Sequence, residues 1–190
     1  MIKTLYPIFQ HWSKTGSVWI LSDLHFDDPD TKLMDPNWID PEEQIKIINK
    51  KVKPNDTFIC LGDIGNFKHI KDIRAKHKVL IMGNHDKNKT KLAEYFDEIY
   101  EGPLFISQKI LLSHEPIVLP FVLNIHGHCH NRQEEYPENF NHLNLAANVA
   151  RFTPVNLKEI IRNGISKIQN IHRIAIESAK KRKERSTDRS

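Results

Sequence analysis

The sequence predicts an α/β fold built as a sandwich, because short buried strands alternate with helices along the chain. Residues 18–21, 56–61 and 79–82 are mostly apolar runs of strand length, and each is followed at once by polar residues. A helix that begins at Asp40, with Pro41 at its first helical position, separates the first two strands. Folds of this class place their functional sites at the carboxyl ends of the strands.

The later elements extend the same pattern. We expect short helices over 67–77 and 88–96, a hairpin of residues 104–106 with 109–112, and strands over 122–125 and 142–149. Asn156 and Glu159 form a capping box that opens a long helix with isoleucines on one side. The predicted organisation is therefore a main domain (1–155), a C-terminal helix (156–179) that packs on it or projects from it, and a basic tail (180–190) without fixed structure.

Length and composition are those of a single globular domain. The chain has 190 residues, of which 39% are hydrophobic and 27% charged. It contains no apolar run of about 18 residues, so we expect no membrane span. The first residues lack a signal-peptide core, and two cysteines cannot make a disulfide framework. These features predict a cytoplasmic protein, or one in a host cytoplasm if the source is viral.

The positive charge is concentrated at one end. Residues 180–190 hold six basic and two acidic side chains, which accounts for the whole net charge of +4. The body of the chain is balanced, so its composition does not indicate a basic nucleic-acid surface. The tail is expected to be solvated or, as the alternative, to contact nucleic acid or a partner.

Polar side chains with metal-binding chemistry follow five of the predicted strands. They form the segments Asp23-x-His25, Gly62-Asp63, Gly83-Asn84-His85-Asp86, Ser113-His114 and Gly127-His128-Cys129-His130. Carboxylate, imidazole and amide oxygen form a mixed ligand set that suits Mn, Fe, Zn, Co or Ni. The seven candidate ligands are too many for one ion and suit two ions that share a bridging group.

The order D-x-H, GD, GNHD, H, G-H-x-H resembles that of the calcineurin-like metallophosphoesterases, over about residues 18–160 and most closely in small bacterial and phage members. The resemblance implies a four-layer α/β/β/α metallophosphoesterase sandwich with a C-terminal helix, in which residues 1–155 are the metallophosphoesterase domain. It also implies phosphoester hydrolysis by a hydroxide that bridges two divalent metal ions, with manganese as the expected metal.

The same resemblance implies a role for each site residue. The first ion would be held by Asp23, His25 and His130, the second by Asn84, His114 and His128, and both by Asp63. The catalytic residues would be His85, which donates a proton to the leaving oxygen or stabilises the phosphoryl group, and Asp86, which orients it.

The substrate is expected to be a phosphodiester, from a nucleotide or a nucleic acid. The basis is the GNHD form, together with the segment after Gly62-Asp63, which lacks the arginine usual in phosphoprotein phosphatases of the family. A phosphomonoesterase acting on small metabolites and a catalytically idle binding module with the same fold are the alternatives.

Aromatic side chains in the loops could stack on a base: Phe26, Trp38, Phe67, Phe121 and Tyr136. Oligomeric state is left open.

Overall fold

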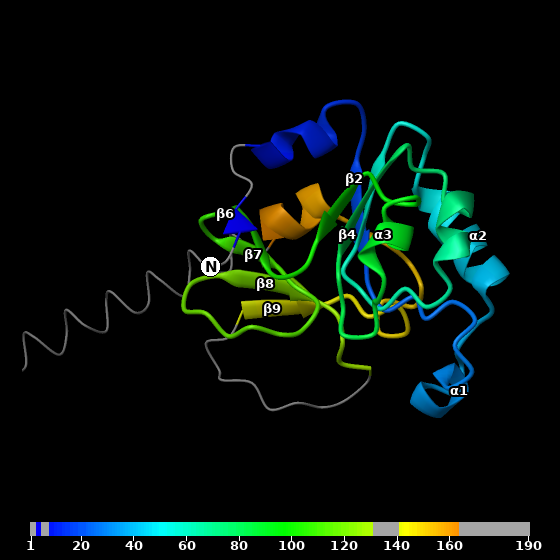
Figure 1. The fold of residues 1–190 in the computed structure, drawn as a ribbon. Helices are drawn as coiled ribbons and strands as arrows, with labels where there is room; N and C mark the ends of the chain where they lie inside the picture. Colours follow the sequence, from blue (N-terminus) through cyan, green and yellow to red (C-terminus); the bar gives the residue numbers. More distant parts are fainter. Residues whose placement is uncertain (1–2, 5–7, 131–140, 164–190) are drawn as a thin grey trace, which may run out of the picture.

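The protein contains two five-stranded sheets packed face to face (Figure 1). The structure is a computed structural model, and it describes residues 3–4, 8–130 and 141–163. Sheet B has the strand order β10-β2-β3-β4-β5. Its strands are β2 (Val18–Leu21), β3 (Thr57–Cys60), β4 (His77–Ile81), β5 (Glu98–Tyr100) and β10 (Val155–Asn156). Strands β2 to β5 are parallel, and β10 joins β2 antiparallel. The carboxyl ends of the four parallel strands therefore meet at one edge.

Sheet A has the order β1-β6-β7-β8-β9. Its strands are β1 (Lys3–Thr4), β6 (Leu104–Ser107), β7 (Ile110–Leu112), β8 (Leu123–His126) and β9 (Asn141–Asn144). β6 and β7 form an antiparallel pair, whereas β7, β8 and β9 are parallel. The carboxyl end of β7 leads into Ser113-His114, and that of β8 leads into Gly127-His128.

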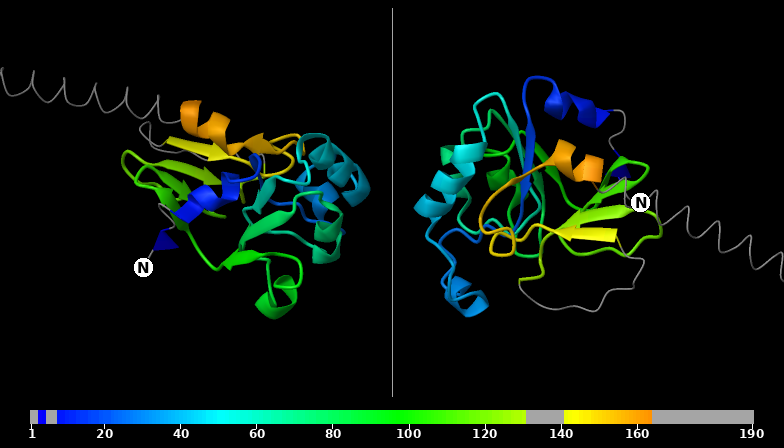
Figure 2. Two further views of the ribbon diagram at one scale, coloured as in Figure 1. Left: turned by 90° about the horizontal axis from the view of Figure 1, so that it is seen from above. Right: turned by 180° about the vertical axis from the view of Figure 1, so that it is seen from behind.

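Short helices connect and cover the sheets. They are η1 (Ile8–Ser13), α1 (Thr31–Met34), α2 (Pro41–Lys51), η2 (Phe67–Asp72) and α3 (Lys89–Leu92), and residues 157–163 are also helical. Helix α2 covers the face of sheet B that points away from sheet A, and α1 projects from the body (Figure 1). Residues 157–163, orange in Figure 2, lie beside η1, in dark blue, and both segments contribute side chains to the core between the sheets.

Sheet B is buried on both faces, as expected for parallel strands. Alternate side chains of one strand enter different cores: Ile20 and Ile59 pack between the sheets, whereas Leu21 and Cys60 pack beneath α2, η2 and α3. Each fully buried aliphatic side chain of this size contributes roughly 1.5–3 kcal/mol to stability. Two-sided burial therefore makes sheet B a rigid platform for the loops that leave its carboxyl edge.

The predicted α/β sandwich is confirmed, and so are the hairpin at residues 104–112 and the start of the C-terminal helix. The strand predicted over 142–149 is wrong in length, because β9 ends at Asn144. The side chain of Asn144 accepts a bond from the backbone of Ala146, which turns the chain, and Ala146 then bridges to Ser22. The apolar residues 145–147 are thus a buried loop that crosses to sheet B.

Two helices are also shorter than predicted. The segment 88–96 is helical only over α3, and 67–77 only as the 3₁₀ helix η2. Residues 164–179 of the predicted C-terminal helix and the tail 180–190 lie outside the described residues. Over the part of the chain that the structure describes, no helix is long and apolar enough to cross a membrane.

Candidate metal centre

The loops after β2, β3, β4, β7 and β8 carry the nine side chains that the sequence singles out, and the structure brings them to one edge of the sandwich. Four of these residues have left-handed backbone conformations, with φ of 55° at Asp23, 42° at His25, 52° at Asp63 and 67° at His128. Non-glycine residues rarely adopt such angles, and they persist where the surrounding structure enforces them. Their concentration at the strand ends marks a functional site.

One cluster consists of Asp23, His25 and His130, whose ligand atoms all lie within 4.8 Å of one another. The Nε2 atom of His130 is 3.4 Å from Oδ1 of Asp23. The Asp23 carboxylate is completely buried and accepts the backbone N–H of His128 on both oxygens, at 3.1 and 2.9 Å. This contact joins the loop after β2 to the loop after β8.

A second cluster consists of Asp63, His114 and His128. The Nε2 atom of His114 lies 3.2 Å from Oδ2 of Asp63, 3.1 Å from Nδ1 of His128 and 2.8 Å from Oδ1 of Asn84. Asp63 also faces the first cluster, since its Oδ2 is 3.9 Å from Nε2 of His25. The seven predicted ligands therefore converge, with the carboxylate of Asp63 between the two clusters.

The electrostatics of the clusters reflect this crowding of opposite charges. Burial acts to lower the pKa of His114, but the hydrogen bond to Asp63 and the charges of Asp23 and Asp63 raise it to about 9. Burial acts to raise the pKa of Asp63, yet the hydrogen bond and charge of His114 hold it below its usual value. Without a cation, this raised pKa favours the protonated imidazole of His114 beside the buried carboxylates.

The donor set fits divalent metal ions. His25 Nε2 is a buried nitrogen without a hydrogen-bond partner among the described residues, and it is directed at the space beside Asp63. The other nitrogen of the ring, Nδ1, contacts Asp28 Oδ2 at 2.9 Å. The Nδ1 atoms of His114 and His130 likewise face the Leu61 carbonyl at 2.9 Å and the Asn148 side chain at 3.1 Å. Such outer contacts fix the ring orientation of metal-binding histidines.

Two glycines let the loops approach the carboxylates closely. A Cβ atom on Gly83 would lie 2.2 Å from Oδ1 of Asp63, and one on Gly127 would lie 2.1 Å from Oδ2 of Asp23. No side chain fits at these distances. The glycines in the GNHD and G-H-x-H segments are therefore required by the packing of backbone against the ligand carboxylates.

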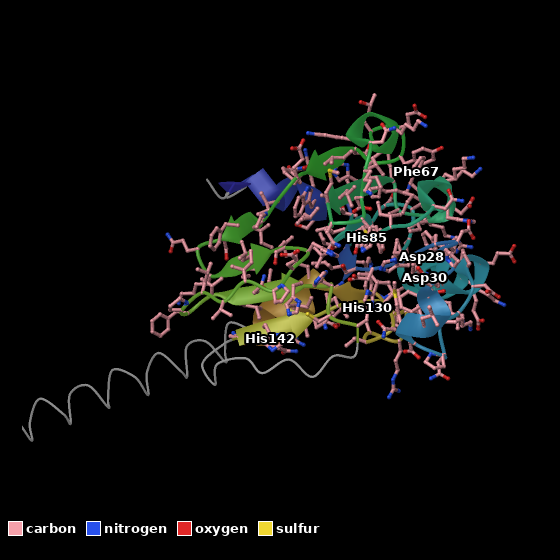
Figure 3. The ribbon with its side chains drawn as sticks, turned by 60° about the horizontal axis from the view of Figure 1, so that its bottom comes forward. Asp28, Asp30, Phe67, His85, His130 and His142 are labelled. Atoms are coloured by element: carbon pink, nitrogen blue, oxygen red, sulfur yellow. The ribbon has the colours of Figure 1, made fainter. Side chains whose placement is uncertain are left out.

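His85 is exposed and lines a cavity of about 300 Å³ together with residues of both clusters. Figure 3 labels it with His130, which lines the same cavity. Its backbone N–H donates to Oδ1 of Asp63 at 2.9 Å, and this bond holds the GNHD loop against the ligand. The imidazole packs edge-on against the ring of His25, with ring centroids 5.9 Å apart, and is exposed to solvent.

The Asp86 carboxylate contacts backbone amides. Within the described residues it makes no contact with the imidazole of His85. Its carboxylate accepts bonds from the backbone amides of Asp63, Ile64 and Gly83, at 2.9, 3.1 and 2.9 Å. Burial raises the pKa of this carboxyl group against the effect of the amide bonds. The expected orientation of His85 by Asp86 is not seen. Asp86 instead ties the loop after β4 to the loop after β3.

Some residues of the site could not be singled out from motifs. The cavity is also lined by Leu33 and Met34 of α1, and Leu33 is 84% exposed. Two of the aromatic side chains suggested as stacking walls, Phe26 and Trp38, are buried, and Trp38 packs edge-on against His25. Tyr136 lies outside the described residues. Leu33 offers the apolar surface that the aromatics were expected to supply.

The aspartate–histidine clusters at the strand ends of the α/β sandwich form a candidate site for divalent metal ions. The family model for calcineurin-like phosphoesterases matches residues 16–180, and the chain belongs to this family. Membership implies metal-dependent phosphoester hydrolysis with divalent metals.

Two solved structures are similar to this chain. A protein of unknown function from Aquifex aeolicus is 28% identical, with a TM-score of 0.64, over 77% of this chain and 98% of that one. The nuclease MPE from Pseudomonas putida is 20% identical, with a TM-score of 0.43, over 58% of this chain and 60% of that one. A comparison with curated proteins gave no significant match.

Proposed function

We propose that the protein is a two-metal phosphodiesterase acting on a nucleotide or a nucleic-acid-derived diester. The observation that carries the diester preference is the lining of the cavity. It consists of Asp63, the apolar Leu33 and Met34, and four histidines: His25, His85, His128 and His130. Among these lining residues there is no lysine or arginine. A monoester dianion would gain from such a cation, whereas a singly charged diester brings a second organic group that suits an apolar wall.

In this proposal Asp23, His25 and His130 hold one ion, Asn84, His114 and His128 hold the other, and Asp63 contacts both. Two bound ions supply the charge that neutralises the phosphate and lower the pKa of a coordinated water. The mixed oxygen and nitrogen ligands suit manganese, with iron, zinc, cobalt and nickel as alternatives.

The residues around the ions complete the chemistry. His85 donates a proton to the leaving oxygen, since its imidazole is exposed over the same cavity as the ligands. Leu33 and Met34 contact the organic group of the substrate and exclude water from that side. Asp28 keeps the imidazole of His25 turned toward the ion through Nδ1.

The test compares bis-para-nitrophenyl phosphate with para-nitrophenyl phosphate, using the manganese-loaded wild type and the His85→Ala variant. We expect faster cleavage of the diester, and a kcat that falls about 10²- to 10⁴-fold in the variant, as for loss of a general acid. Rapid cleavage of the monoester alone would favour a phosphomonoesterase. No hydrolysis of either ester, or of cyclic nucleotides and oligonucleotides, would favour a binding module.

A further inference from the structure

A third group of metal-ligating side chains lies outside the centre described above. His11 comes from η1, His77 begins β4, and Glu98 begins β5. Nε2 of His11 is 2.7 Å from Oε1 of Glu98, and Nε2 of His77 is 2.6 Å from the same oxygen. The three ligand atoms all lie within 4.8 Å of one another. Three elements that are distant in sequence thus present two imidazoles and a carboxylate to one point.

This group is separate from the metal centre. His77 stands at the amino end of β4, whereas Asn84 follows the carboxyl end of the same strand. At about 3.3 Å per residue, the seven steps between them span roughly 20 Å. An ion bound by His77 could not share a ligand with either cluster at the strand ends, so the two sites can be altered independently.

The chemistry of the group suits a divalent cation of the zinc class. Two histidines and one glutamate, with an open fourth position, form a known protein ligand set for zinc. Burial acts to raise the pKa of Glu98, but hydrogen bonds from Tyr100, His11, Trp12 and His77 lower it to about 2, so the carboxylate is ionised at neutral pH. The side chains of His11 and His77 are 42% and 32% exposed, which leaves an approach for the ion and for water as a fourth ligand.

Surrounding groups already hold these side chains in place. The Tyr100 hydroxyl donates to Oε2 of Glu98 at 2.5 Å, and the Trp12 indole N–H donates to Oε1 at 2.9 Å. Oδ2 of Asp97 lies 3.7 Å from Nδ1 of His77, on the side of the ring away from Glu98. Contacts of this kind orient ligands and strengthen histidine as a donor.

We propose that His11, His77 and Glu98 bind a further divalent metal ion, of the zinc class, which fastens η1 to sheet B. Ligand atoms about 2.0–2.1 Å from a tetrahedral ion stand about 3.3 Å apart, so each imidazole moves away from the carboxylate by several tenths of an ångström. The protons shared between the imidazoles and Glu98 in the metal-free protein leave as the ion enters.

The test counts ions in the whole protein. Wild type and the His11→Asn/His77→Asn variant are loaded with zinc, freed of excess by gel filtration and analysed for metal content per chain. We expect one ion fewer in the variant, whatever number the metal centre retains. The control is His69→Asn, which removes an imidazole paired with the Asp27 carboxylate at 2.8 Å and should leave the count unchanged.

A second variant keeps the test decisive if the double variant does not fold. Glu98→Gln is nearly isosteric, and its zinc content is measured beside that of the double variant, with circular dichroism as the folding check. We expect zinc to raise the Tm of the wild type more than that of either variant. Equal zinc content in the wild type and in a folded variant of either kind would overturn the proposal, and the group would then be a hydrogen-bonded cluster without an ion.

Discussion

His25 shows how a predicted metal ligand is oriented by a residue that lies outside the recognisable motif. Its Nε2 is directed into the metal centre because Nδ1 is engaged by Asp28, on the opposite side of the ring. Asp28 follows His25 by three residues, but it can make this contact only because the chain turns sharply between them. Asp27 in that turn has a left-handed φ of 57°.

Replacing Asp28 by asparagine should weaken metal binding about 10- to 100-fold, because the anionic partner that orients His25 is lost. Calorimetric titration of the metal-free protein with manganese measures the change. Asp30→Asn is the control, since Asp30 is exposed and only its backbone N–H contacts Asp28. Equal affinity of wild type and Asp28→Asn would remove Asp28 from the site.

Leu33 gives a test of substrate contact that does not touch the metals. Leu33→Ala should raise the KM for bis-para-nitrophenyl phosphate about five- to tenfold and leave kcat unchanged, because loss of apolar contact acts equally on substrate and transition state. Steady-state kinetics measure both constants. The control is Val118→Ala, which truncates another exposed apolar residue, one that does not line the cavity. An unchanged KM would place the substrate elsewhere.

At this scale, the sequence predicted the side chains that come straight after strands, because strand ends fix their position. It could not predict Asn148 behind His130, or the Leu61 carbonyl behind His114, because these contacts depend on how distant loops fold against each other. Trp38 could not be assigned either, since an aromatic loop residue is as able to pack beneath a ligand as to face the substrate.

At the level of elements, the loops after β3 and β4 act as a unit through Asp86. Asp86→Asn should lower the free energy of unfolding by about 1–3 kcal/mol, because an amide has one accepting oxygen where the carboxylate has two. Urea unfolding in the presence of a chelator measures this change. The control, His85→Ala, alters an exposed neighbour and should unfold like the wild type. A stable Asp86→Asn variant that fails only in catalysis would instead favour a chemical role for Asp86.

Glu98 joins η1 to strands β4 and β5, and its contribution should depend on pH. The pKa of Glu98 is lowered from 4.5 to about 2 in the folded protein, so this stability is present above about pH 4.5 and is lost as the pH falls toward 2. The Tm difference between wild type and Glu98→Gln in chelator should therefore be larger at about pH 7 than at about pH 3. Glu94→Gln, an exposed glutamate outside the group, serves as the control. A difference that does not vary with pH would contradict this role.

Elements were predicted well where burial is two-sided and poorly at the edges. β2, β3 and β4 are central strands with apolar residues along most of their length, and all three were predicted, although β4 begins two residues earlier than expected, at His77. β5 lies at the edge of sheet B with partly exposed residues, and β10 has only two residues, so neither has a pattern that distinguishes it from a loop. The buried residues 145–147 have the apolar pattern of a strand, because a loop that is buried between two sheets is as apolar as a strand within one sheet.

For the whole molecule, metal binding and folding should be coupled in a pH-dependent way. The pKa of His114 is raised from 6.5 to about 9, so without metal its contribution to stability is complete below about pH 6.5 and is lost as the pH rises through about 9. Protons also compete with the ion for this imidazole. The gain in Tm on adding manganese should therefore increase from about pH 6.5 to about pH 8.5, and at 100-fold excess over Kd it should correspond to about 2.7 kcal/mol per ion.

Thermal unfolding with and without manganese across this range measures the coupling. Asn84→Ala, which removes a ligand oxygen beside His114, should reduce the gain at every pH. A gain that is constant with pH would mean that His114 does not have to release a proton for the metal to bind.

The contact between Asp23 and the backbone of His128 joins residues 105 positions apart. A ribosome synthesises the chain from its first residue, so the loop after β2 emerges long before the segment that closes the cage around it. Until His130 has left the exit tunnel, a nascent chain has an incomplete set of the predicted ligands and should bind a metal only weakly. In the proposed site, an ion therefore gains its full set of ligands only after the segment with His128 and His130 has emerged.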